Sequence, residues 1–318
     1  MNTSAAVDGF LLARTAEGYS PHTIRDYRLT LRRLVEHLED PDIATITATD
    51  VRSFMAAMRA RRYRGKPLGQ HTLANMWCAI RSFFGWCLEE RLITSRPDAG
   101  LKRPQYTRQP IEPFSREDIA ALLKAAEYTA EAVTHGRRPF RMRRPTARRD
   151  AAIVLFLLDT GLRVGEVERL TVADVDLESG EVAVHPYNSG RKSRGRHVYL
   201  GNVARRALWR YLAEREPEPT ADDPLFVSLD RYPMDRSSIS HMLRELGKRA
   251  GVAKVHPHRF RHTMALWFLR NGGDVFSLQR ILGHSTLDMV RQYVALAEAD
   301  AASAHRRASP ADNWRLNG

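Results

Sequence analysis

The sequence predicts a mainly α-helical protein with a small β-sheet, divided into two domains, and three features of its 318 residues support this. Apolar side chains recur at helical spacing through most of the chain. A proline-rich stretch without periodicity separates two such regions, as an extended linker would. One short region changes to a period of two residues, which is typical of β-strands.

The first hundred residues are predicted to form a small bundle of helices. In "SPHTIRDYRLTLRRLVEHLED", Ser20 is suited to cap a helix, Pro21 fits its first turn, and the apolar residues share one face. A second helix is expected from about Thr49 and a third within "HTLANMWCAIRSFFGWCLEERLI", with a short helix before all three. These helices would form the domain at 1–104.

The predicted linker is 105–111, within a stretch (95–115) that holds four prolines, and the second domain is 112–318. The pattern "SRED" from Ser115 to Asp118 predicts a capping box, and a central apolar helix is expected from about Arg149. Between them, 137–149 carries seven arginines. Such a run is typical of a solvated surface, and equally of a loop beside DNA.

A β-hairpin is predicted after "TGLRVGEVERL". The segments "GEVAVHPY" and "RHVYLG" alternate like strands, and the turn-rich "NSGRKSRG" joins them. The tip of this hairpin would be strongly basic, and helices resume after it.

The charge indicates a polyanionic partner. Fifty Lys and Arg residues against 37 Asp and Glu give a net charge of +13 and a pI near 10.2. Nucleic acid is the usual partner of such a protein, and the alternative is a basic protein without one. The residues predicted to contact double-stranded DNA are Arg25, Arg28, Arg32, Arg62, Arg64, Lys66, Arg191, Arg194 and Arg259.

The sequence favours a cytoplasmic, nucleoid-associated protein without a membrane partner. No apolar run approaches the roughly 20 residues of a membrane span, and the N-terminus lacks the pattern of a secretory signal. Cys78 and Cys87 lie nine residues apart on an apolar helix, so they are predicted to be core thiols and neither a metal pair nor a disulfide framework.

Three short motifs carry the candidate catalytic residues. "TGLRVGE" holds Arg163, "HPHRFRHT" holds His258 and Arg261, and "LGHSTLDMVRQYV" holds His284 and, nine residues later, Tyr293. In this order, behind a basic helical region, the motifs resemble those of the tyrosine recombinase (phage integrase) family. Helices that begin almost at residue 1 favour its simple Xer-like or transposon-type members. The resemblance spans nearly the whole chain.

The resemblance implies a SAM-like core-binding bundle, followed by an α+β catalytic domain. It implies a site-specific DNA recombinase that cuts through a 3′-phosphotyrosine and exchanges strands through a Holliday junction. The active form would be a homo-tetramer on DNA, and the free protein would be a monomer or weak oligomer. The resemblance also allows for an accessory or partner recombinase. No cofactor, nucleotide or metal is implied, and the additional arm-binding domain of some integrases is expected to be absent.

Each residue type suits the role that the resemblance implies. Tyr293 would be the nucleophile, because a phenol preserves the energy of the phosphodiester. Arg163 and Arg261 would bind the phosphate with planar sets of donors. His258 would exchange a proton with the tyrosine, and His284 would donate a hydrogen bond.

Three nearby residues are given supporting roles. Glu166 lies one helical turn beyond Arg163 and is expected to brace it. His262 is expected to pack or cap, and Arg259 to contact a backbone phosphate.

The family's catalytic lysine, which protonates the leaving 5′-oxygen, lies on the β-hairpin, and Lys192 is the only lysine there. Arg191 occupies the expected position when residues are counted back from "RHVYLG", so the register of the assignment stays open. Arg191, Arg194 and Arg196 are expected to lie around the lysine as tip cations that lower its pKa.

Two other functional classes remain open, and the tail suggests a further contact. A type IB topoisomerase would use similar chemistry to relax supercoils, and a non-catalytic DNA-binding protein could share the fold. Near the C-terminus, Trp314 and Leu316 form an apolar group after Pro310. The resemblance implies that such a segment docks on a neighbouring protomer, and the alternative is a disordered end.

Overall fold

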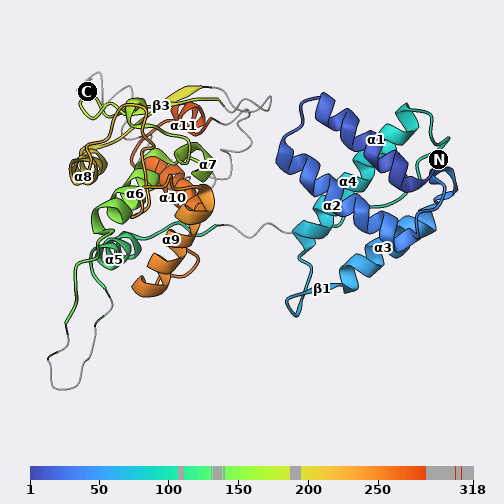
Figure 1. The fold of residues 1–318 in the computed structure, drawn as a ribbon, viewed down its shortest axis with the longest axis horizontal. Coiled ribbons are helices and arrows are strands. Elements are labelled where there is room, and N and C mark those ends of the chain that lie inside the picture. The colour runs from blue at the N-terminus through green and yellow to red at the C-terminus, as the bar shows by residue number, and fades with distance from the viewer. Residues whose placement is uncertain are drawn as a thin grey trace, which may run out of the picture. The chain divides into compact units, whose positions relative to one another are not determined.

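The computed structural model describes residues 1–106, 111–129, 131, 138, 140–186, 195–283, 305 and 309. The chain forms two compact units (Figure 1): the first comprises Met1–Gln109, and the second most of the residues from Pro110 onward. Within the described residues, no helix is long and apolar enough to cross a membrane. These residues also contain no cluster of histidine, cysteine and acidic side chains that could hold a metal ion.

The N-terminal unit is a helical bundle. Its elements are α1 (Thr3–Ala16), α2 (Pro21–Leu38), the 3₁₀ helix η1 (Ile43–Thr45), α3 (Ala48–Ala60), β1 (Arg62–Tyr63), β2 (Lys66–Pro67) and α4 (Gln70–Glu89). Phe10, Phe54, Phe83 and Phe84 are fully buried and anchor the core. The predicted N-cap of α2 is confirmed, because Ser20 Oγ accepts a hydrogen bond from Thr23 N at 3.2 Å. The helix before α2 was expected to be short, but α1 is 14 residues long.

Two local features of this unit differ from the predictions. The hairpin β1–β2 was not predicted, because each strand is only two residues long and shows no periodicity. Its turn places Arg64 and Gly65 at positive φ, as two-residue hairpin turns require.

The prediction of two core thiols is wrong for Cys78, which is exposed while Cys87 is buried. Nine helical residues correspond to two and a half turns, so the two side chains lie on opposite faces of α4.

The second unit is built around α6. Its elements are α5 (Arg116–Glu127), α6 (Ala147–Thr160), α7 (Val164–Val167), η2 (Val172–Asp174), β3 (Glu181–Val184), β4 (Arg196–Tyr199), α8 (Asn202–Ala213), α9 (Arg236–Ala250), α10 (Pro257–Arg270) and α11 (Val275–Leu282). Helix α6 packs against α5, α8 and α10, and Ile153, Val154 and Leu157 on it are fully buried. The predicted central helix and the capping box of α5 at Ser115 and Asp118 are confirmed.

The predicted β-hairpin is also confirmed. Strands β3 and β4 pair antiparallel, with Val182 opposite Val198 and Val184 opposite Arg196. All three valines are buried. Because side chains alternate along a strand, Arg196 shares the inward face with Val198. The tip residues Arg191, Lys192 and Arg194 lie outside the described residues.

The arginine-rich segment is partly structural, which neither interpretation of 137–149 anticipated. Asp150 is fully buried and accepts hydrogen bonds from Arg144 Nη1 and Arg149 Nη2, both at 2.8 Å. Thr146 Oγ1 also donates to this carboxylate, at 2.9 Å. On the surface, Arg148 pairs with Glu214 and Arg141 with Glu131. The buried arginines therefore hold the start of α6 and do not point into solvent.

Candidate catalytic site

Helix α10 begins where the second motif requires it. The His256 imidazole caps the helix by accepting a hydrogen bond from Arg259 N at 3.2 Å, and Pro257 occupies the first turn. His258 and Arg261 are three residues apart, so both side chains lie on the same side of the helix. His258 is exposed, whereas Arg261 is only 2% exposed.

Arg261 joins the three motifs. Its Nη1 donates to the carbonyl of Gly161 at 2.8 Å, and its Nη2 donates to the carbonyl of Leu282 at 2.6 Å. Gly161 ends α6 with φ at 61°, a conformation that favours glycine, and Arg163 follows two residues later. Leu282 is the last residue of α11 and opens the Leu-Gly-His motif. The guanidinium thus brings together segments more than a hundred residues apart in the sequence.

Arg163 is positioned by Glu166. The Glu166 carboxylate accepts a hydrogen bond from the Arg163 backbone N–H at 2.8 Å and a longer one from its Nη1 at 3.3 Å. This is the contact predicted from their spacing. The Arg163 side chain remains 46% exposed, so its guanidinium can reach a ligand.

A second arginine, Arg196, holds the same carboxylate, and sequence reasoning missed this role. Its Nη1 and Nη2 donate to the two oxygens of Glu166 at 2.9 and 2.8 Å. Burial alone would raise the pKa of Glu166, but the hydrogen bonds and positive charge of Arg196, with those of Arg163, lower it.

The expectation that Arg196 is a cation at the hairpin tip is therefore wrong. Its side chain is 9% exposed and lies on the inward face of β4. The signal was present in "RHVYL", where Arg196 alternates in phase with the buried Val198 and Leu200. A charge suggests exposure, but a buried arginine is stable where acceptors surround it.

His262 contacts His258. Their Nε2 atoms are 3.1 Å apart, and the rings meet edge to face. His262 is buried at 7% exposure, which confirms that it packs, and the contact places a second imidazole beside the predicted acid–base residue.

The structure gives Arg259 partners within the protein, and its predicted phosphate contact stays a prediction. Its Nε donates to Glu112 O at 2.9 Å and its Nη1 to Ala253 O at 2.6 Å, while its Nη2 contacts Pro113 O and pairs with Asp118. The guanidinium also lies 3.9 Å from the centre of the Phe114 ring. A side chain with all three nitrogens engaged inside the protein is a structural link between α10 and the start of this unit.

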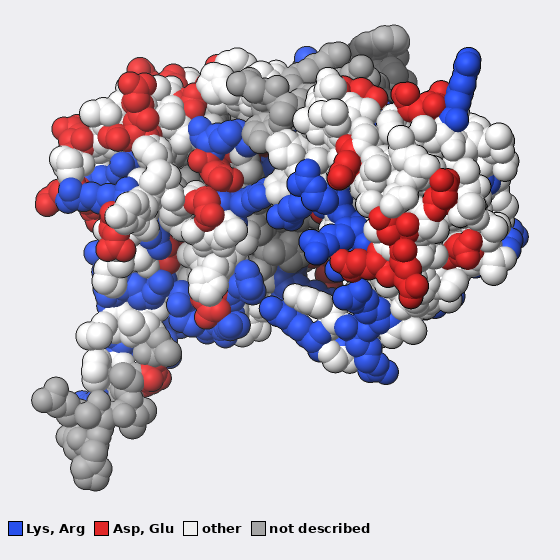
Figure 2. All heavy atoms as spheres, turned by 45° about the vertical axis from the view of Figure 1, so that its right-hand side comes forward, with Lys and Arg blue, Asp and Glu red and all other residues white. Residues whose placement is uncertain are grey.

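Other predicted site residues lie on the surface of the first unit or outside the described part. Lys192, Arg191, Arg194, His284 and Tyr293 are outside it. The predicted DNA contacts in the N-terminal unit, namely Arg25, Arg28, Arg32, Arg62, Arg64 and Lys66, are all exposed, with Arg32 paired to Glu36 at 3.0 Å. Figure 2 shows Lys and Arg side chains gathered in groups on the surface.

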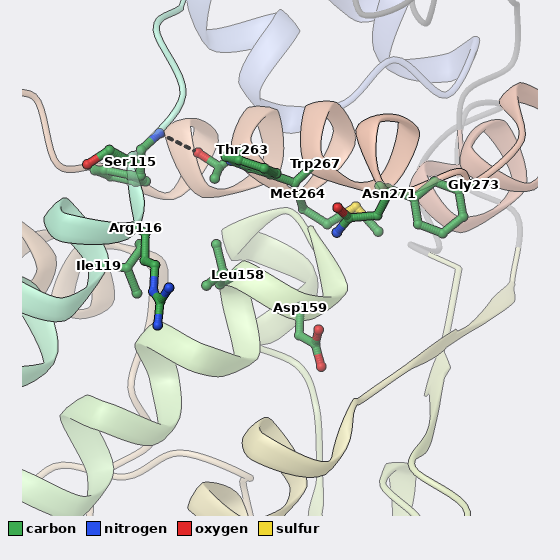
Figure 3. A pocket seen from close by; sticks show the side chains of 12 residues that line it. Ser115, Arg116, Ile119, Leu158, Asp159, Thr263, Met264, Trp267, Asn271 and Gly273 are labelled. Carbon is green, nitrogen blue, oxygen red and sulfur yellow. Dashed lines mark hydrogen bonds between the residues drawn. The ribbon is translucent and has the colours of Figure 1, made fainter. Parts of the chain in front are cut away.

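A separate pocket of about 550 Å³ lies among α5, α6 and α10 (Figure 3). Its walls are mainly apolar and include Leu158, Met264 and Trp267. Burial raises the pKa of Asp159, which also lines the pocket, although Gly201 N–H donates to its carboxylate. Arg163, His258 and Arg261 do not line this pocket, so it is distinct from the candidate catalytic site.

Both units of the chain match known protein families. The pattern of the Phage integrase family matches residues 112–300, and that of the phage integrase N-terminal SAM-like domain matches residues 9–91. The chain is 29% identical to the tyrosine recombinase XerC of Yersinia pestis over 92% of this chain and 89% of that protein. It is 27% identical to XerC of Alcanivorax borkumensis over 97% of this chain and 95% of the relative.

Solved structures share the fold. The Tn1549 transposon integrase in complex with transposon right end DNA superimposes with a TM-score of 0.73 at 19% identity, covering 95% of this chain and all of that one (100%). A lambda integrase tetramer bound to a Holliday junction gives a TM-score of 0.71 at 16% identity, covering 92% of this chain and 77% of that one. Because the family matches cover both units, the chain belongs to the phage integrase family of tyrosine recombinases.

Proposed function

We propose that this protein is a site-specific DNA recombinase that cuts and rejoins duplex DNA through a 3′-phosphotyrosine at Tyr293. The observation that carries the proposal is the pair of hydrogen bonds from Arg261 to the carbonyls of Gly161 and Leu282. These bonds assemble the three motifs and fix the orientation of a buried guanidinium, as a phosphate-binding arginine requires. Membership of the family supports the same reaction.

In the proposed reaction, Arg163 and Arg261 bind the non-bridging oxygens of the scissile phosphate. They stabilise the charge that develops as the Tyr293 oxygen attacks phosphorus. His258 exchanges a proton with the phenol, and His284 donates a hydrogen bond to the phosphate or the nucleophile. Lys192 protonates the 5′-oxygen as the P–O bond breaks. The reverse sequence rejoins the strand, because the phosphotyrosine conserves the energy of the bond.

The proposed assembly is a homo-tetramer that exchanges strands in pairs through a Holliday junction. The lambda integrase structure, a tetramer on such a junction with the same fold, supports this assembly. The net charge of +13 favours double-stranded DNA as the partner. A cytoplasmic location at the nucleoid and a further accessory or partner recombinase are part of the proposal. The reaction needs no added cofactor.

Trapping covalently bound DNA tests this function. Wild-type protein is incubated with fragmented DNA from its own genome and denatured, and the attached DNA is sequenced. A recombinase is expected to enrich one short site, and a plasmid with two copies of that site should then undergo excision or inversion. Relaxation without site preference would instead indicate a type IB topoisomerase, and absence of attached DNA a non-catalytic protein.

Two tyrosine variants control the trapping experiment. Tyr293→Phe removes only the nucleophilic oxygen, so it is expected to keep DNA binding and lose covalent attachment. Tyr199→Phe removes the same atom from a β4 side chain that is 58% exposed. It should trap DNA as the wild type does. Trapping by the Tyr293 variant would contradict the proposed mechanism.

A further inference from the structure

Arg196 is a buried arginine whose three nitrogens all donate within the candidate site. Its Nε donates to the carbonyl of Ile281 at 2.7 Å, and its Nη1 and Nη2 bind the Glu166 carboxylate. We infer that Arg196 is a positioning residue that holds the arginine motif, the end of α11 and the catalytic hairpin in one arrangement. This inference rests on the proposed recombinase function.

The first effect of Arg196 concerns the availability of Arg163. Arg196 binds both oxygens of Glu166 at under 3 Å, whereas the side chain of Arg163 makes only a 3.3 Å contact with the carboxylate. The bidentate ion pair with Arg196 neutralises most of the charge of Glu166. Without Arg196, Arg163 would be the remaining cationic partner of this buried carboxylate among the described residues. The carboxylate would then compete with the phosphate for the Arg163 guanidinium.

The second effect concerns the end of α11. Arg196 and Arg261 donate to the consecutive carbonyls of Ile281 and Leu282, which the helix itself leaves without partners. Gly283 follows with φ at 63°. A β-carbon at Gly283 would lie 3.2 Å from Cδ, Nε and Cζ of Arg196, so the glycine backbone packs directly on the guanidinium. The next residue in the sequence is the predicted catalytic His284.

The third effect concerns the hairpin. Arg196 is the first residue of β4, and it pairs with Val184 at the last residue of β3. Lys192 lies four residues before it in the sequence. The contacts of Arg196 therefore fix the return strand of the hairpin to Glu166 and Ile281. The described start of β4 is thereby tied to the carboxylate that also contacts Arg163.

The test compares Arg196→Gln with a matched control, Arg205→Gln. Arg205 in α8 also binds backbone carbonyls, those of Leu177 and Glu178, but has no contact with the three motifs among the described residues. For Arg196→Gln we expect the single-turnover rate of covalent cleavage to fall on the order of 10²-fold, as for misplaced catalytic groups. The DNA dissociation constant should stay within about threefold, since phosphate contacts elsewhere supply most of the affinity. Arg205→Gln should cleave at the wild-type rate.

A second substitution separates positioning from mere structural support. If Arg196 acts by restraining Glu166, removing the carboxylate charge in the double variant Arg196→Gln with Glu166→Gln should restore part of the lost rate. A double variant that is slower than, or equal to, Arg196→Gln would overturn this mechanism. Equal losses for Arg196→Gln and Arg205→Gln, or an unchanged rate for Arg196→Gln, would also overturn the inference.

Two controls distinguish a loss of positioning from misfolding of the variant and from failure of the proposed function. If Arg196→Gln does not fold by thermal unfolding, Arg196→Lys replaces it. A single ammonium cannot span the carboxylate and the Ile281 carbonyl, so this variant is also expected to be slower, by at least about tenfold. A wild-type rate for Arg196→Lys would refute positioning. Failure of this inference can be told apart from failure of the proposed recombinase function. In the second case the wild-type protein itself would form no covalent adduct with DNA.

Discussion

Replacing Asp150 with asparagine is expected to destabilise the second unit strongly. The carboxylate is fully buried at the first turn of α6 and pairs with Arg144 and Arg149, whose side chains are 17% and 13% exposed. Asparagine keeps the shape of the side chain but removes its charge. Both guanidinium groups would then remain in a mostly buried environment without a counter-ion.

The size of the effect follows from this burial. Removing one partner of a buried ion pair costs about 3–5 kcal/mol, and the lower end applies because both arginines keep some contact with water. For a unit of this size, ~3 kcal/mol corresponds to a lower Tm by roughly 6–12 °C. The matched control is Glu214→Gln, which breaks the exposed pair with Arg148. Its expected cost is about 0–1 kcal/mol.

Hydrogen exchange of peptides from α6, measured in increasing urea, gives the free energy of unfolding of this unit without interference from the first unit. Asp150→Asn should lower that free energy far more than Glu214→Gln does. If both variants lower the free energy of unfolding equally, by less than about 1 kcal/mol, the buried arginine pairs do not stabilise α6. The structural role inferred for the arginines of 137–149 would then be wrong.

Three further predictions concern DNA. Lys192→Ala should slow cleavage by roughly 10²–10⁴-fold but recover on a 5′-bridging phosphorothiolate, whose sulfur leaves without a proton, whereas Arg191→Ala should impair both substrates equally. Recovery with Arg191→Ala instead would reassign the general acid. Mobility-shift assays should show affinity falling with a log–log salt slope on the order of −5, as for six neutralised phosphates, and a nearly flat dependence would contradict the DNA-binding proposal. Deleting 309–318 should weaken synapsis more than single-site binding, and unchanged recombination would refute a role for the tail.

Local signals in the sequence predicted most elements correctly. Ser20 and Ser115 cap helices through their own hydroxyls, and strands β3 and β4 follow from alternation over a few residues. These features depend on neighbouring residues, so sequence patterns detect them. The β1–β2 hairpin is too short to give a periodic pattern.

The errors occur where tertiary contacts decide the environment of an arginine. Arg259 and Arg261 are two residues apart and point to different sides of α10, yet both are buried. Their partners lie in distant segments, such as Glu112 for Arg259 and Gly161 for Arg261. The charges of Arg196 and Arg149 likewise favour the surface, and the burial of their partners Glu166 and Asp150 does not follow from spacing.

The covalent link between protein and DNA tests the central claim most directly. Trapped adducts are digested with protease and nuclease, and the peptide that carries a nucleotide is sequenced by mass spectrometry. The chain has ten tyrosines. The proposed mechanism predicts a single 3′-phosphate ester on the oxygen of Tyr293. Attachment through another tyrosine or another residue type, or a 5′-phosphate link, would contradict it.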